Sequence, residues 1–149
     1  MTAKTRITIE VTPEQADAIS AALDLYSRLA IGQVREISHA FRFERVPTYR
    51  VENADRFCEI ADRIESLTHE MSRALGFLPG ASLGIHNTRV HLAGRRAYEV
   101  QKVLDKALAD HRDPNPNSPG VTHYGLQLRC THDPEPVATV IQCEKEDVL

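Results

Sequence analysis

The amino-acid sequence predicts an α+β fold, in which a small antiparallel sheet packs on three helices in the order β-α-α-α-β-β. Short stretches that alternate apolar and polar residues lie near both ends of the chain, and they indicate strands. Between them, apolar residues recur at steps of three and four, as on one face of a helix. The 149 residues suit a single domain, residues 1–149, and we expect its acidic end at residues 144–149 to fray.

The composition argues against several classes of function. The formal charge of −3 disfavours sequence-independent binding of DNA, which needs a basic excess. No stretch is long and apolar enough to span a membrane, and the first residues lack the apolar core of a signal peptide. A disulfide framework is not expected, because the cysteines are sparse and odd in number: Cys58, Cys130 and Cys143. We therefore expect neither a nucleic-acid polymer nor a membrane as a partner. We expect the protein to be located in a reducing cytoplasm.

The first predicted element is a strand at residues 6–11 with one buried face. That face consists of Ile7, Ile9 and Val11. A helix start follows at once, because Thr12 is a suitable cap and Pro13 suits the first helical position. Gln15 stands where a capping box places its second partner.

The first helix is predicted to run over residues 13–43. Its buried stripe consists of Ile19, Leu23, Tyr26, Ala30, Val34, Ile37 and Phe41. Gly32 would lie deep inside this helix and cost about 1 kcal/mol relative to alanine. We expect it to allow the close approach of a crossing helix. A kink at Gly32 that divides the element in two is the alternative.

The second helix is predicted to begin after Asn53, a suitable cap, and to stop at Gly76. Its stripe consists of Phe57, Ile60, Ile64, Leu67, Met71 and Leu75. Two long helices joined by a short connector predict an antiparallel hairpin. After an irregular stretch at residues 77–87, a third helix is expected from residue 90 or 92 to residue 111. The proline-rich residues 113–120 end it.

The last predicted elements are two strands, at residues 121–130 and 137–142. The connector at residues 131–136 is long enough for a hairpin turn. Gly125 is expected to mark a bulge in the first of the two strands. Together with the strand at residues 6–11, this hairpin completes the small antiparallel sheet on one side of the helices.

A cationic cluster before the third helix is the strongest candidate for a binding site. The loop at residues 80–84 carries glycines and a serine, Ser82, whose backbone amides can form a nest for an anion. Close to it in sequence are Asn87, Arg89, Arg95 and Arg96. Anions are favoured at such a helix N-terminus. The alternative is a solvated basic face balanced by Glu99.

Arg28 is a second candidate, because it flanks the stripe of the first helix. A guanidinium at the edge of an apolar face can grip a phosphate or carboxylate with two donors. It can equally form an ion pair with Asp24, one turn earlier. Tyr26 and Gln33 lie nearby, and for Tyr26 we expect a core position with a bonded hydroxyl.

The sequence holds no recognisable catalytic or metal-binding motif, so an enzyme is the less favoured interpretation. Neither the pair His86 and His91 nor the pair Cys130 and His132 has a known metal spacing. Acidic residues recur every three positions at Glu59, Asp62 and Glu65, a partial pattern for Mg²⁺ binding in a nucleotide hydrolase. Charges on the outer face of an amphipathic helix explain it more simply. No cofactor, metal or catalytic residue is therefore predicted.

Three segments carry a resemblance to a known class of proteins. LDLYSRLAIGQ at residues 23–33, AYEVQKVL at residues 97–104 and DPEPVATV at residues 133–140 resemble small accessory proteins of tailed phages and prophages. The resemblance spans residues 23–140. It implies a phage-encoded protein that works in the cytoplasm of the host.

In size and element order the chain is also similar to phage counter-defence sponges of the Thoeris anti-defence 1 kind. That similarity implies a homo-oligomer that sequesters a small nucleotide-type signal, such as a cyclic nucleotide, without cleaving it. In this interpretation the arginines hold the anionic group, Phe77 or Tyr98 stacks on a base, and Asn87 binds its polar edge. The candidate ligand-binding residues are Arg28, Phe77, Ser82, Asn87, Arg89, Arg95, Tyr98 and Arg129. The alternative is an interaction protein whose helical hairpin docks on a host or phage protein.

Overall fold

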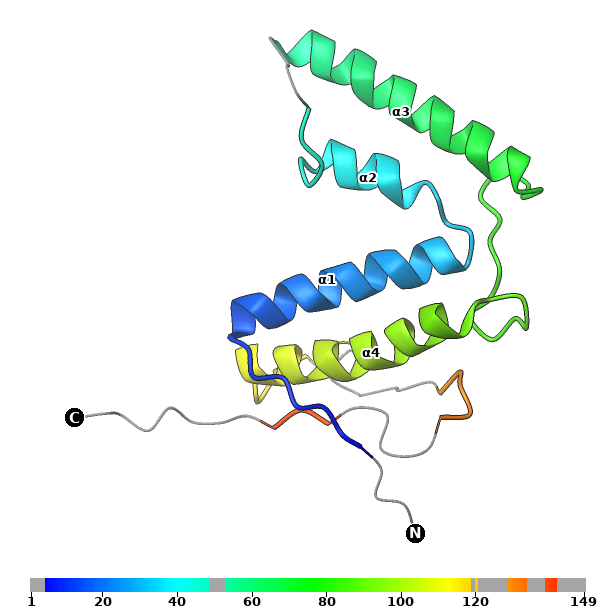
Figure 1. Cartoon of the computed structure of the whole chain (residues 1–149). Coiled ribbons are helices and arrows are strands. Elements are labelled where there is room, and N and C mark those ends of the chain that lie inside the picture. The colour runs from blue at the N-terminus through cyan, green and yellow to red at the C-terminus, as the bar shows by residue number, and fades with distance from the viewer. Residues whose placement is uncertain (1–4, 49–52, 119, 121–128, 134–138, 142–149) are drawn as a thin grey trace.

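The computed structural model describes residues 5–48, 53–118, 120, 129–133 and 139–141, and in them it contains four helices (Figure 1). The helices are α1 (Pro13–Ala30), α2 (Glu36–Arg42), α3 (Ala54–Ala74) and α4 (Leu92–Arg112). No strand is present in these residues. The predicted α+β class is therefore wrong for the described part of the chain, which is all-helical.

The predicted N-terminal strand is an extended segment without a neighbouring strand. Alternation gives a segment two different faces, but a strand forms only where another strand supplies hydrogen-bond partners. Among the described residues, no backbone hydrogen bond joins residues 5–11 to another segment, and Ile7 is 87% exposed. The predicted hairpin lies mostly outside the described residues, and its described parts at 129–130 and 139–141 are not strands.

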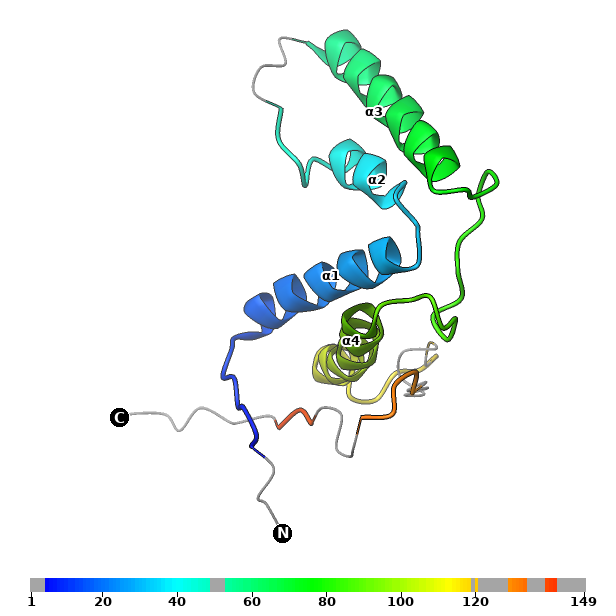
Figure 2. The same cartoon turned by 45° about the vertical axis from the view of Figure 1, so that its right-hand side comes forward.

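The helices form two pairs. In Figures 1 and 2, α1 and α4 lie side by side and run in opposite directions, and α2 and α3 lie beyond α1. Among the four helices, α3 packs only on α2, and α2 in turn touches α1. The predicted hairpin of two long helices is therefore not formed, because α3 packs on the short α2 and the most extensive contact between the described helices joins α1 to α4.

Both predicted helix N-caps are confirmed. The Thr12 side chain accepts a hydrogen bond from the Gln15 amide, and the Gln15 side chain accepts one from the Thr12 amide at 2.9 Å, which completes the capping box. Pro13 occupies the start of α1. Asn53 caps α3, because its side chain accepts a hydrogen bond from the Arg56 amide at 2.9 Å. These caps satisfy amides that a helix start leaves without partners.

The predicted helix over residues 13–43 is two helices, and Gly32 separates them. Gly32 has φ +91°, in the left-handed region. Its amide donates to the Leu29 carbonyl at 3.0 Å, and the Gln33 amide donates to the Arg28 carbonyl at 2.9 Å, the pair of bonds of a Schellman motif. The close neighbour of Gly32 is the ring of Phe77, not a crossing helix, and a Cβ on Gly32 would overlap that ring.

The same pair of terminal bonds ends α3 and α2. At the end of α3, Gly76 has φ +82° and its amide donates to the Arg73 carbonyl, so the predicted stop at Gly76 is confirmed. At the end of α2 the left-handed residue is Glu44, with φ 56°. Its amide donates to the Phe41 carbonyl and the Arg45 amide to the Ala40 carbonyl, both at 2.9 Å. Glu44 therefore carries a strain that glycine would not.

Small residues bring α1 and α4 together. Gly94 in the first turns of α4 is buried, and a Cβ there would overlap the Cβ of Ala30 at the end of α1.

The buried apolar residues of the described chain are Ala16, Val34, Phe41, Ala61, Val90, Ala97, Leu108 and Cys130. Tyr26, predicted for the core, is exposed. The predicted stripes are therefore only partly buried within one chain.

Replacing Glu44 by glycine should raise the free energy of unfolding by about 1 kcal/mol, because glycine adopts a positive φ without a Cβ clash. Urea denaturation followed by circular dichroism measures this. Glu44→Ala is the matched control, since it removes the carboxylate but keeps the Cβ, and it should leave the stability near that of the original chain. An equal gain from both variants would contradict the backbone argument.

Gly32→Ala should lower the free energy of unfolding by about 2–4 kcal/mol, since backbone strain and overlap with the Phe77 ring both oppose it. Gly76→Ala is the control, because Gly76 has a similar φ but no atom lies within 4 Å of the place that a Cβ would take there. The control should lose only about 1–2 kcal/mol from strain. Equal losses in thermal or urea unfolding would show that Phe77 does not pack on this turn.

Candidate functional site

The predicted cationic cluster lies around the N-terminus of α4, and its arginines bind other parts of the chain. Arg95 donates from Nη2 to the Asn87 carbonyl at 2.7 Å and from Nη1 to the Cys130 carbonyl at 3.5 Å. Arg96 donates from Nε and Nη2 to the Asp133 carboxylate at 2.6 and 2.9 Å. The Arg129 guanidinium donates to the Asp133 carbonyl. These guanidinium groups hold the segment at residues 129–133 against α4.

Glu99 is the centre of this attachment. Glu99 is only 4% exposed. Its carboxylate accepts hydrogen bonds from the Cys130 amide at 2.6 Å and from the Thr131 amide at 2.8 Å. The Thr131 hydroxyl donates to the other carboxylate oxygen at 2.9 Å. A buried carboxylate needs such partners. The sequence-based alternative placed Glu99 on a solvated face, and nothing local in the sequence indicates that it binds residues 130–131.

The charges around this attachment change the acidity of two groups. Hydrogen bonds from Arg96 hold the pKa of Asp133 below its usual value, so this carboxylate stays ionised in mild acid. Burial, and then the negative charge of Glu99, raise the pKa of the Cys130 thiol to about 11. Cys130 is therefore a protonated thiol at neutral pH, which is a poor nucleophile and a poor metal ligand.

A second group of predicted residues lies at the turn after α1. Arg28 donates from Nε to Asp24 at 2.7 Å and from Nη1 to the Gln33 side chain at 3.4 Å, so the ion pair with Asp24 is formed. Gln33 in turn donates to the Ser82 hydroxyl at 3.2 Å. The Leu83 amide donates to the Ile31 carbonyl at 2.8 Å. The loop at residues 80–84 is thus attached to the end of α1.

The remaining two candidates differ in exposure. Tyr98 on α4 is partly buried, which raises the pKa of its hydroxyl, and the Lys102 ammonium lies 5.1 Å from its ring centroid. Arg89 is exposed, and its side chain forms no hydrogen bond or ion pair with the described residues. The eight candidates therefore fall into two groups, one at the turn after α1 and one at the start of α4. Of the four arginines among the candidates, Arg28, Arg95 and Arg129 already have partners within the chain.

Two of the acidic residues that suggested a partial Mg²⁺ pattern, Asp62 and Glu65, also have cationic partners. Arg42 donates to Asp62 at 2.9 Å and to Glu65 at 2.8 Å, and Arg35 donates to Glu65 at 3.0 Å. The hydrogen bond from Arg42 is the main reason why the pKa of Glu65 lies below its usual value. Within the described ranges, no three histidine, cysteine, aspartate or glutamate side chains lie close enough together to hold a metal ion. No described helix is long and apolar enough to cross a membrane.

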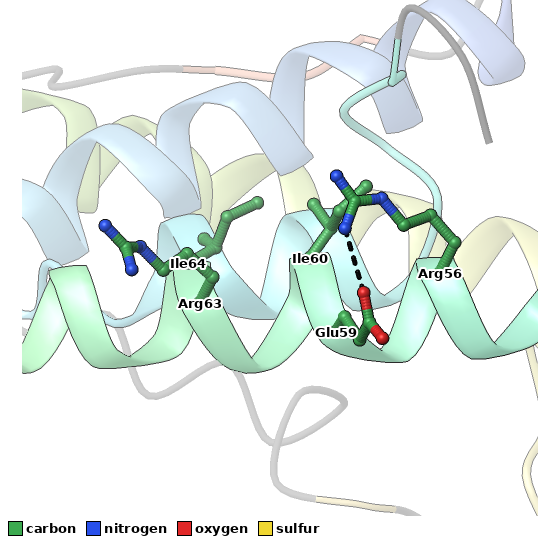
Figure 3. Close-up of a pocket in the computed structure, with 5 residues that line it drawn as sticks. All are labelled: Arg56, Glu59, Ile60, Arg63 and Ile64. Carbon is green, nitrogen blue, oxygen red and sulfur yellow. Dashed lines mark hydrogen bonds and ion pairs between the residues drawn. The ribbon is translucent and has the colours of Figure 1, made fainter.

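A depression of about 350 Å³ lies on the surface of α3 (Figure 3). It is lined by Arg56, Glu59, Ile60, Arg63 and Ile64. Figure 3 shows the two isoleucines between the two arginine side chains, and Arg56 bonded to Glu59 at 2.8 Å. Arg63 has no ion pair or hydrogen bond to another described residue. The depression is open to solvent and has an apolar floor with a cation at its rim.

The apolar floor continues along α3. Leu67 is 45% exposed and Met71 is 46% exposed, although both belong to the predicted buried stripe. The side of α3 that packs on α2 is different: Ala61 and Thr68 are buried there, and Phe57 stacks on Phe41 with ring centroids 5.1 Å apart. We call the uncovered surface the α3 face, and it consists of Ile60, Ile64, Leu67 and Met71 with the flanking Arg63 and Glu70.

The two described cysteines should differ sharply in reactivity. Cys58 is exposed and Cys130 is buried with a pKa of about 11, so a thiol reagent such as DTNB should label Cys58 at least about a hundredfold faster at pH 8. The measurement uses a Cys143→Ser background, and Cys58→Ser and Cys130→Ser variants assign the two phases. Fast labelling of Cys130 in the folded protein would contradict its burial against Glu99.

Comparison of the chain with protein-family models, with curated proteins and with solved structures gives no match in any of the three. The resemblance to phage accessory proteins and to nucleotide sponges therefore stays a prediction from the sequence. The function has to be argued from the surface and the side chains described above.

Proposed function

We propose that this protein is a non-catalytic interaction module that binds another protein chain through the α3 face. The observation that carries the proposal is that α3 packs on α2 alone among the described helices, while Leu67 and Met71 stay about half exposed and Ile60 and Ile64 stay partly exposed beside them. Contiguous exposed apolar surface with a polar rim is typical of a protein-binding site. A helix in such a setting pairs with the apolar side of another helix.

The flanking charges define the chemistry of the partner. Arg63 and Glu70 lie on the same side of α3, seven residues or two turns apart, and neither is paired with a described residue. A partner helix would therefore carry an apolar seam, a carboxylate opposite Arg63 and a cation opposite Glu70. Such pairs add little affinity at a rim, but they select the partner and its direction.

The engaged state of the arginines supports this function over a nucleotide trap. Arg28, Arg95 and Arg96 donate to Asp24, to two backbone carbonyls and to Asp133. A ligand phosphate would have to displace these internal acceptors, and the free energy of those bonds would be lost on binding. An accessory role in a tailed phage, which the resemblance implies, fits a module that acts by binding a protein in the host cytoplasm.

The experiment compares Leu67→Glu on the α3 face with Leu92→Glu on α4, since the two leucines are 45% and 41% exposed. Tagged and untagged copies are expressed together, and material purified through the tag is analysed by native mass spectrometry and by proteomics. We expect one protein chain, either the untagged copy or another protein, to be recovered with the original chain and with Leu92→Glu. Recovery should fall at least about tenfold with Leu67→Glu.

Two outcomes would overturn the proposal. One is that Leu67→Glu and Leu92→Glu recover the same proteins in the same amounts, which would show that the α3 face binds nothing. The other is that a nucleotide-type compound is retained by all three proteins and no protein chain depends on Leu67. The second outcome would support the nucleotide trap that the sequence predicts.

A further inference from the structure

We propose that the partner of the α3 face is α3 of a second copy of this chain, packed antiparallel about a twofold axis. The inference rests on the proposed function and names the occupant of the same face. It follows from the spacing of the apolar residues, from the position of the two unpaired charges, and from the side of α3 that α2 leaves open.

The apolar residues of α3 have the spacing of a coiled-coil seam. Steps of three and four alternate without a break along Phe57, Ile60, Ile64, Leu67, Met71 and Ala74. These are the a and d positions of three heptads, with Phe57, Ile64 and Met71 at a. In an antiparallel pair each a residue faces a d residue. Ile64 then lies opposite Leu67 of the partner subunit, and Ile60 lies opposite Met71 of the partner subunit.

The two charges without a partner in the described part of the chain favour the antiparallel direction. Arg63 and Glu70 both occupy g positions, one residue before Ile64 and Met71. In an antiparallel pair g faces g, so Arg63 meets Glu70 of the partner subunit, and the twofold axis repeats the pair. In a parallel pair g would face e, where Thr68 and Leu75 offer no charge. Only the antiparallel arrangement pairs both groups.

The position of α2 leaves room for this partner. Ala61 and Thr68 occupy e positions and are buried, and α2 is the only helix that packs on α3 among the four described. The g side carries the exposed Arg63 and Glu70, so α2 covers one edge of the seam and a second α3 covers the other. The pair would then be a four-helix assembly of two α2–α3 hairpins. Each surface is complementary to itself, as a twofold interface requires.

The size of the face predicts a reversible dimer. The 21 residues of α3 span about 31 Å at 1.5 Å per residue. A single seam of this length, whose side chains are only partly exposed, forms a small interface compared with the standard specific interface, which buries roughly 800 Å² per partner. We therefore expect a dissociation constant in the micromolar range rather than a permanent dimer.

The test is sedimentation equilibrium of the full chain and of two charge-reversal variants. The original chain should dimerise, and Arg63→Glu and Glu70→Arg should each raise the dissociation constant about tenfold, since each places two like-charged pairs at the interface. A one-to-one mixture of the two variants should restore the original affinity, because the heterodimer contains two opposite-charge pairs. Arg73→Glu, on α3 but away from the seam, is the matched control and should leave the dissociation constant unchanged. Circular dichroism confirms that each variant is folded.

Three results would overturn the inference. The original chain could remain a monomer up to millimolar concentration, the mixture could be no tighter than either variant alone, or Arg73→Glu could weaken the dimer as much as Arg63→Glu. The proposed function is judged separately by the Leu67→Glu purification. A chain that is always monomeric but loses another protein when Leu67 is changed would refute the self-pairing and keep the interaction module.

Discussion

The structure depends on one turn, where the left-handed backbone at Gly32 lies against the ring of Phe77. This turn ends α1 and sends the chain back into α2. The connection that leaves α3 passes the same point, because Phe77 follows the last turn of α3 and Leu83 bonds to the Ile31 carbonyl. Both covalent links between the α1–α4 pair and the α2–α3 pair therefore meet at Gly32. Only a residue without a side chain allows that meeting, since a Cβ would occupy the space of the ring.

The α1–α4 pair uses its charges to hold its own chain. Glu99 accepts three hydrogen bonds from residues 130 and 131, and Arg96 binds Asp133 with two donors. Opposite charges on α4 thus attach one segment that is more than thirty residues away in sequence. The consequence for function is that a cluster which looks suited to an anion is largely occupied by internal carboxylates and carbonyls.

The α2–α3 pair has a different character, because the charges between its two helices are paired while part of the apolar stripe of α3 is left open. Arg35 and Arg42 neutralise Glu65 and Asp62 along one edge of α3. A helix of seven residues such as α2 is too short to cover the seam of a helix of 21 residues. The face that remains is apolar in the middle and charged at its edge. This is the composition expected of a surface that is buried only in a complex.

The sequence by itself determined the features that depend on bonds within a few residues. The capping box at Thr12, the cap at Asn53 and the glycine stop at Gly76 are closed by neighbours at most five residues away, so a local pattern is sufficient to predict them. The apolar stripe of α3 and the extent of α4 are also local features, because they follow from helical periodicity and from the proline-rich stretch after α4. The limits of the third helix were therefore predicted to within one residue at its end.

Only the tertiary structure decided the features that depend on distant partners. Gly32 ends a helix where the ring of Phe77 packs against it. Residues 6–11 would form a strand only beside a neighbouring strand. Arg95 is not free for a ligand, because it bonds to the Cys130 carbonyl. Of the eight candidate residues, the chain links Arg28 to Ser82 through Gln33, and it links Arg95 to Asn87. Hydrogen bonds and packing across long sequence separations leave no periodic trace, so residue spacing could not reveal them.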